Sequence, residues 1–395
     1  MTSKPKTKYE QLDPITHILK RPDMYCGSNR IREVTEYLAG ADFTISKQSI
    51  KSSPAILRIF VEVLSNAIDN VDRSTKAGIP CTKIKVSIDK ETGETSVWND
   101  GDVVPIELDP VQNCYNHTMI FGRLLTGSNY DDEEERVVAG RNGLGSKLCN
   151  VFSEKFTVEG CDPTAGKTLV QTWTNNMRDT EGPVIKPTKL TKGYTKITWI
   201  PDFKHFGIKK YTKDIIKLYT RYVIDAAMIS KVNVSINDVP IGVNNLTKYG
   251  ALYSSPTNEK LLIKTDTCEV LLTPATEFEA ISFVNGVFTK LGGQHVDSWS
   301  EAIFRPIVDK FNGKNKGKSK TPKININDVK QFFRIFVVAT VVRPEFDGQD
   351  KNKLESPVVS ATVKPANINA IMKWSVIESI EDVIRSKEML VLKKS

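Results

Sequence analysis

The hydrophobic pattern of this chain changes from the period of a helix to the period of a strand within its first hundred residues. Apolar residues recur every three or four positions between Pro54 and Val71, which predicts an amphipathic helix. Residues 83–88 then alternate as a strand, and residues 95–98 form a second strand after a turn. A hairpin directly after such a helix predicts a helical layer packed on antiparallel strands.

The same combination of periods continues to about residue 240. A second long amphipathic helix is expected at residues 212–227. Further strands are expected at residues 155–159, 169–173, 195–199 and 231–236. We therefore expect an α+β sandwich here, with helices on a mixed, mostly antiparallel sheet.

The pattern starts again after residue 240. Strands are expected at residues 261–272, 280–289 and 332–342, and helices at residues 296–311 and 368–392. Because 395 residues are too many for one ordinary compact core, we expect two domains, at residues 1–240 and 241–395.

The composition indicates an intracellular protein without a membrane span. No run of about 18 apolar residues is present, and no apolar run follows the basic N-terminus as in a secretory signal. The six cysteines are scattered without a CxxC pair, which argues against a zinc site or a disulfide scaffold. The four histidines do not cluster in sequence, so we expect structural or surface roles for them.

The net charge of +8 is weak evidence for a polyanionic partner, so the distribution of charge matters more than its sum. Six lysines and no acid lie between Lys310 and Lys323, among Gly, Asn, Ser and Pro. Two interpretations stay open, a solvated loop and a loop that contacts the phosphates of a nucleic acid.

Four polar residues share one face of the first predicted helix, because residues three and four apart are neighbours: Glu62, Asn66, Asp69 and Asn70. Mg²⁺ prefers oxygen ligands, and an Asn side chain supplies one. A carboxylate one turn away could accept a proton from a water that attacks a phosphate. A simple solvated helix face is the equally weighted alternative.

Two loops add to this pattern. Residues 99–101, Asn-Asp-Gly, are expected to end the second strand as a turn, which can direct one side chain at a base edge. Residues 140–147, GRNGLGSK, precede a predicted helix and could cradle a phosphate with backbone amides and Lys147. This segment does not match a Walker A loop, and residues 165–168 end like one but lead into a strand.

These three elements, in this order, resemble the nucleotide-binding module of gyrase, the large heat-shock chaperone, histidine kinases and mismatch-repair ATPases, the GHKL fold. Longer segments resemble eukaryotic-type and large-DNA-virus DNA topoisomerase II, from about Tyr9 to the end of the chain. They include ILKRPDMYCGS, IFGRLLTGSNYDD, ISFVNG, GGQHVD and EFDGQDK. The resemblance implies a GHKL ATPase domain with an N-terminal arm at residues 1–240. At 241–395 it implies an α/β transducer domain like domain 2 of ribosomal protein S5.

The resemblance also implies roles for matching residues of the first domain. Glu62 would be the general base, Asn66 the Mg²⁺ ligand, and Asn70 a contact near the ribose and phosphates of ATP. Asn99 occupies the adenine-contacting position. The remaining nucleotide contacts would be Ser128, Asn129, Arg141, Asn142, Gly143, Leu144, Gly145, Ser146 and Lys147.

Further roles fall at the ends of the match. Gln349 and Lys351 would reach from the second domain to the γ-phosphate, and Tyr9 would enter the nucleotide site of a partner subunit. A DNA-facing basic loop would contain Lys314, Lys316, Lys318 and Lys320. Val61 and Val103 depart from the family pattern, which bears on nucleotide affinity, and Gly127 stands where the family often has a second Ser.

The expected function is an ATP- and Mg²⁺-dependent gate that closes as a homodimer around duplex DNA. A nucleotide-dependent chaperone or clamp without DNA transport is the alternative, and the second-domain motifs favour the gate. A histidine kinase is disfavoured because no phospho-acceptor segment precedes the module. Nothing here resembles the family's DNA-cleaving domains. The expected location is intracellular: the nucleus for a cellular protein, or a cytoplasmic viral factory or virion for a viral one.

Overall fold

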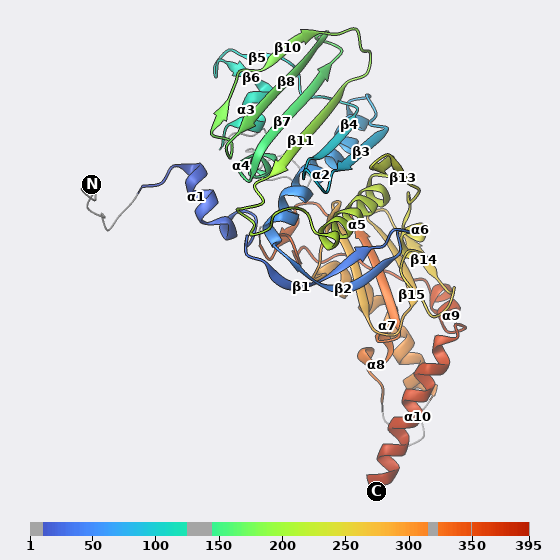
Figure 1. Cartoon of the computed structure of the whole chain (residues 1–395). Coiled ribbons are helices and arrows are strands. Elements are labelled where there is room, and N and C mark those ends of the chain that lie inside the picture. The colour runs from blue at the N-terminus through green and yellow to red at the C-terminus, as the bar shows by residue number, and fades with distance from the viewer. Residues whose placement is uncertain (1–10, 125–143, 315–322, 349, 395) are drawn as a thin grey trace, which may run out of the picture.

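The computed structural model describes residues 11–124, 144–314, 323–348 and 350–394. It contains two large sheets with helices packed on them, and the C-terminal helix extends away from the body (Figure 1). This arrangement confirms the expected α+β fold. None of the described helices is long and apolar enough to cross a bilayer.

The first sheet has nine strands in the order β10-β8-β7-β11-β4-β3-β12-β13, with β9 paired to β8. Only β12 and β3 pair in parallel among these strands, so the sheet is mixed and mostly antiparallel. The strands are β3 (Lys83–Ile88), β4 (Thr95–Asp100), β7 (Ser153–Asp162), β8 (Lys167–Thr174), β9 (Asp179–Thr180), β10 (Val184–Pro187), β11 (Tyr194–Pro201), β12 (Asn233–Ile236) and β13 (Val239–Ile241).

Helices cover one face of this sheet. The long helices α2 (Pro54–Lys76) and α5 (Lys213–Ser230) and the short α4 (Gly145–Val151) bury apolar side chains in one cluster with the sheet. Ser53 begins α2 as its N-cap and Pro54 follows at the first helical position, where a missing amide proton costs nothing. The smaller elements are α1 (Pro14–Lys20), a 3-10 turn (Pro22–Met24), α3 (Asn116–Gly122), β5 (Leu108–Asp109) and β6 (Cys114–Tyr115).

A separate antiparallel ribbon of β1 (Arg32–Ala39) and β2 (Ile45–Ser52) lies against α5. The hydrophobic pattern of the sequence did not predict these strands. Leu38 and Ile50 of the ribbon bury against Leu218 of α5 in a small cluster of their own. The ribbon therefore extends the helical layer toward the second sheet.

The second sheet has five strands in the order β14-β15-β18-β16-β17. They are β14 (Leu261–Lys264), β15 (Cys268–Pro274), β16 (Glu279–Val284), β17 (Val287–Phe288) and β18 (Phe333–Ala339). The other elements of this half are α6 (Leu246–Gly250), α7 (Gln294–Lys314), α8 (Ile326–Lys330), α9 (Pro365–Ile371), α10 (Val376–Lys394) and the pair β19 (Glu345–Phe346) and β20 (Leu354–Ser356).

Several predicted elements need correction. The predicted strand at 261–272 is two strands, because the chain turns back at Thr265, whose amide donates to Cys268 at 2.8 Å. The predicted strand at 280–289 is also a hairpin, with Asn285 and Gly286 at positive φ in its turn. The predicted helix at 368–392 is two helices, and Asn99 and Asp100 belong to β4 rather than to a turn.

The two halves are joined by polar and apolar contacts. Lys290 donates to Glu36 of the ribbon at 2.6 Å, and Tyr37 donates to Glu279 of the second sheet at 3.1 Å. Phe283, Phe288 and Phe336 belong to the hydrophobic cluster of the first half. The junction is therefore a packed interface and not only a covalent linker.

Candidate functional site

The site is built on the polar face of α2. The opposite face of this helix is buried, with Ile56, Phe60, Val63, Leu64 and Ala67 in the core. Because the helical period fixes which residues share a face, burying this stripe orients Glu62, Asn66 and Asp69 away from the core. The sequence also placed Asn70 on this face, but its side chain is buried.

The Glu62 side chain is held between two neighbours. Its Oε1 forms an ion pair with the Arg58 guanidinium, one turn earlier on α2. Its Oε2 lies against Gly145, the first residue of α4, where a Cβ atom would be 2.1 Å away. The structure thus places the carboxylate at the start of the helix that follows the glycine-rich segment.

Asn66 is exposed and Asp69 is half-buried on the same face of α2. Burial raises the pKa of the Asp69 carboxyl to about 7, although the positive charges of Lys351 and Arg73 lower it. Lys351 therefore lies close enough to α2 to act on Asp69, although it is far away in sequence. Lys351 itself is half-buried and has a positive φ of 53°.

Asn70 and Asn99 meet at the end of β4. Both side-chain amides donate to the backbone carbonyl of Asp100, at 3.2 Å and 3.1 Å. The Asp100 carboxylate accepts from the Thr82 and Lys83 amides at 2.7 Å and 2.9 Å, and these hydrogen bonds lower its pKa against the opposing effect of burial. Two buried amides thus lie side by side.

The first turn of α4 brings further predicted residues to α2. Leu144 is half-buried at the N-cap, and Ser146 and Lys147 are buried. Burial lowers the pKa of the Lys147 ammonium to about 8. Since α4 packs on α2, a buried cation lies in the same region as the carboxylate of Glu62.

Several predicted site residues lie outside the described residues. They are Tyr9, Ser128, Asn129, Arg141, Asn142, Gly143, Lys316, Lys318, Lys320 and Gln349. Lys314 is the last residue of α7, and its side chain is not described. For the rest, the structure brings together Glu62, Asn66, Asn70, Asn99, Leu144, Gly145, Ser146, Lys147 and Lys351 on or beside α2 and β4.

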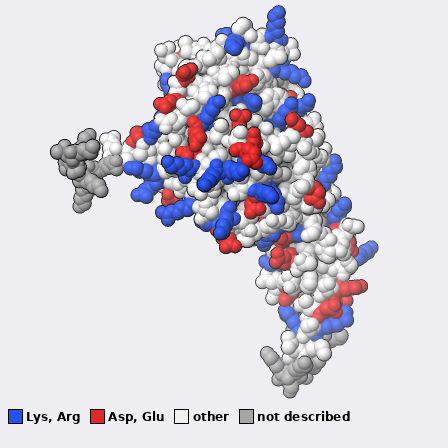
Figure 2. Space-filling model, viewed as in Figure 1, with Lys and Arg blue, Asp and Glu red and all other residues white. Residues whose placement is uncertain are grey.

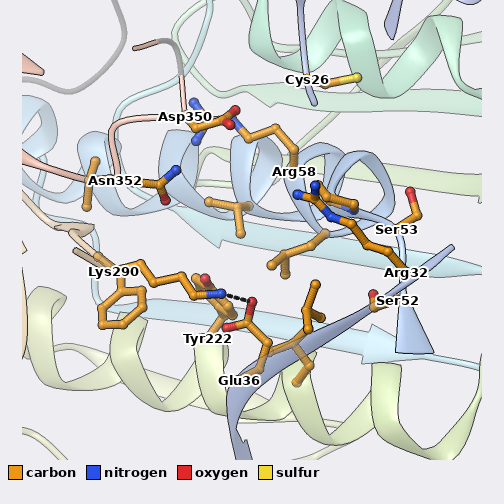
Figure 3. A pocket seen from close by; sticks show the side chains of 17 residues that line it. Cys26, Arg32, Glu36, Ser52, Ser53, Arg58, Tyr222, Lys290, Asp350 and Asn352 are labelled. Carbon is orange, nitrogen blue, oxygen red and sulfur yellow. Dashed lines mark hydrogen bonds and ion pairs between the residues drawn. The ribbon is translucent and has the colours of Figure 1, made fainter. Parts of the chain in front are cut away.

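A pocket of about 150 Å³ adjoins this site at the junction of the two halves (Figure 3). Leu57, Arg58 and Val61 of α2 line one wall, and Asp350 and Asn352 come from the second half. The Arg58 side chain reaches toward Asp350, while Lys290 pairs with Glu36 at the other end of the pocket. The sequence analysis missed Arg58, although its spacing four residues before Glu62 was a usable signal.

The donor set fits a magnesium ion that arrives with a nucleotide. Asn66 offers an exposed amide oxygen one turn from Glu62, and Mg²⁺ commonly takes one or two protein oxygens while phosphates and water fill the other positions. No group of three or more His, Cys, Asp or Glu side chains in the described ranges could hold a metal by itself.

Comparisons with known proteins show which family this chain resembles. A family model described as histidine kinase-, DNA gyrase B- and HSP90-like ATPase matches residues 53–182, and one described as DNA gyrase B matches residues 207–384. The chain is 36% identical to DNA topoisomerase 2 of Invertebrate iridescent virus 6, over 99% of this chain and 36% of that protein. It is also 36% identical to DNA topoisomerase 2-alpha of Sus scrofa, over 98% of this chain and 26% of that protein.

Solved structures are similar over nearly their whole length. The ATPase region of Saccharomyces cerevisiae topoisomerase II matches with a TM-score of 0.84 and 32% identity, over 95% of this chain and 98% of that one. The ATPase and transducer domains of Balamuthia mandrillaris topoisomerase II match with a TM-score of 0.88 and 29% identity, over 98% and 100%. The chain spans about a third or less of the curated relatives it matches.

Proposed function

Because this chain belongs to the type II DNA topoisomerase family and matches its ATPase region, we propose that it binds and hydrolyses ATP and thereby closes and opens a gate for DNA. The observation that carries this proposal is the position of the Glu62 carboxylate against Gly145. If the glycine-rich segment at residues 140–147 holds the terminal phosphate, a carboxylate that contacts this segment lies beside the water that would attack the phosphate.

The described residues divide the chemistry among them. Glu62 accepts a proton from the attacking water, and Asn66 offers an oxygen to the magnesium that accompanies ATP. Magnesium in phosphoryl transfer neutralises charge that develops on the phosphates. Asn70 and Asn99, joined at Asp100, bind the nucleoside end, and Lys147 adds positive charge beside the phosphates.

The second half supplies the coupling. Lys351 acts on Asp69 in this structure, so a γ-phosphate that attracts Lys351 would draw the second half toward α2. Gln349 joins Lys351 in this role. We assign residues 1–240 to the ATPase domain with its arm, and residues 241–395 to the transducer domain.

ATP binding would then close a homodimer, in which each Tyr9 enters the other subunit's site, around a duplex that contacts Lys314, Lys316, Lys318 and Lys320. Lys and Arg side chains also gather across the middle of one face, between α1 and β1 (Figure 2). Such a surface favours a polyanionic partner. Since relatives occur in eukaryotes and large DNA viruses, the place of action is the nucleus or a viral factory or virion.

The test combines two measurements on the whole chain. ATP turnover should need Mg²⁺ and rise with duplex DNA, and the rise should weaken with salt. Light scattering should show mostly monomer without nucleotide and dimer with a non-hydrolysable ATP analogue and Mg²⁺. Hydrolysis without any response to DNA would favour a chaperone-like clamp. A monomer under saturating, demonstrably bound analogue would contradict the gate.

A further inference from the structure

The Arg58–Glu62 ion pair is not explained by helix stability. The pair has the i,i+4 spacing, but Arg precedes Glu, which is the less favourable order on a helix. Both side chains are largely buried, with 12% and 19% of their surfaces exposed. The Arg58 cation therefore offsets part of the cost of removing the Glu62 carboxylate from water. We therefore expect the ion pair to serve the site rather than the stability of α2.

The two carboxylate oxygens of Glu62 have different neighbours. Oε1 pairs with Arg58, whereas Oε2 faces Gly145 at the start of α4. When one oxygen of a carboxylate is held by an ion pair, the group can no longer rotate freely. The second oxygen, here Oε2, therefore points in a fixed direction. That direction is toward the segment where the proposed function places the terminal phosphate.

The same cation lies next to the segment that carries Lys351. Arg58 and Asp350 line one pocket, and the Arg58 side chain reaches toward Asp350 (Figure 3). The charges of Arg58, Asp350 and Glu62 all act on the buried Cys26 thiol, whose pKa rises to about 12 chiefly through burial. Arg58 thus pairs with the proposed base and also lines a pocket with Asp350 and Asn352.

We propose that Arg58 is a positioning residue that anchors Oε1 of Glu62 so that Oε2 faces the attacking water. This inference rests on the proposed ATPase function and adds a residue to it. In this proposal Arg58 acts through Glu62 rather than directly on the water or the phosphate. Its contribution is orientation, which matters because small misplacements of a reacting group cost large factors in rate.

The test compares Arg58→Gln and Arg58→Lys with the unmodified chain in steady-state ATP hydrolysis. Arg58→Gln should lower kcat roughly 10- to 100-fold while KM for ATP stays within about twofold. Arg58→Lys keeps a cation and should recover most of the rate. The double variant Arg58→Gln/Glu62→Gln should be no slower than Glu62→Gln alone, since the anchor has nothing left to hold.

Arg305→Gln is the matched control, because Arg305 pairs with Glu301 at the same spacing on the exposed face of α7. It should leave kcat unchanged. If Glu62→Gln is inactive but Arg58→Gln has an unchanged kcat, the inference about Arg58 is wrong while the proposed function stands. The inference would also be overturned if Arg58→Lys did not recover the kcat that Arg58→Gln loses, and if the loss came with weaker analogue binding and a lower melting temperature. Arg58 would then have a structural role. Absence of hydrolysis by the unmodified chain would instead contradict the proposed function.

Discussion

Gly145 and Glu62 approach so closely that a side chain at position 145 has no room. A Cβ atom on Gly145 would lie 2.1 Å from Oε2 of Glu62 and 3.2 Å from its Cβ. The first distance is far shorter than van der Waals contact and the second is tight, so the flexible end of the Glu62 side chain would have to move. The lack of a side chain at 145 is what lets the carboxylate reach the start of α4.

Gly145→Ala should therefore displace the Glu62 carboxylate and lower ATP turnover by about tenfold or more, with a smaller effect on nucleotide affinity. Turnover and analogue binding measured side by side would separate the two effects. Gly242→Ala is the control, because a Cβ there meets no atom within 4 Å. Full activity in Gly145→Ala would mean that the placement of the carboxylate is unimportant.

Glu62→Gln should abolish hydrolysis while nucleotide still binds. The amide keeps the shape of the side chain but cannot accept a proton, so the rate should fall by roughly 10²–10⁴-fold. Single-turnover hydrolysis and analogue binding are the measurements, with the exposed Glu301→Gln as control. Turnover close to that of the unmodified chain would assign the base to another residue.

Lys351→Ala should weaken hydrolysis more than binding, because charge near the γ-phosphate is needed most as that phosphate is transferred. The positive charge of Lys351 already lowers the pKa of Asp69 on α2 against the larger effect of burial. Lys353→Ala removes an exposed lysine that pairs with Glu355 at 3.1 Å, and it should have little effect. Equal hydrolysis rates for Lys351→Ala and Lys353→Ala would show that Lys351 has no special role in catalysis.

The stability of the chain should depend on two buried histidines. Burial lowers the pKa of both His117 and His295 to about 4, below the usual value near 6.5. The unfolded chain therefore takes up protons at a pH where the folded chain does not. Each histidine should lower the free energy of unfolding as pH falls from about 6.5 to 4, by up to about 1.4 kcal/mol per pH unit.

His117→Met should remove one of these two contributions. Both ring nitrogens of His117 lack a hydrogen-bond partner among the described residues, so the substitution breaks no such bond there. Urea unfolding at several pH values between 4 and 7 would measure the difference in slope between the variant and the unmodified chain. Parallel stability profiles would show that His117 titrates normally in the fold.

Local sequence patterns were sufficient for much of the first half. The apolar stripe of α2 and the alternation of β3 appear at the predicted positions, since each pattern reports the burial of one element. The polar face of α2 follows from the same period. The ribbon β1–β2 was missed because burial does not alternate along either strand: it increases toward the end of β1, and four consecutive residues of β2 are exposed.

The sequence by itself determined the helix α2 and the shared face of Glu62, Asn66 and Asp69, whereas the contact of Glu62 with Gly145 came from the fold. Only the tertiary structure decided that Arg58 holds one oxygen of Glu62 and that the charge of Lys351 acts on Asp69. The order of the strands and the hairpins at residues 261–274 and 279–288 also came only from the fold. The physical reason is that periodicity records whether a residue is buried, whereas the identity of its neighbours depends on how distant segments pack.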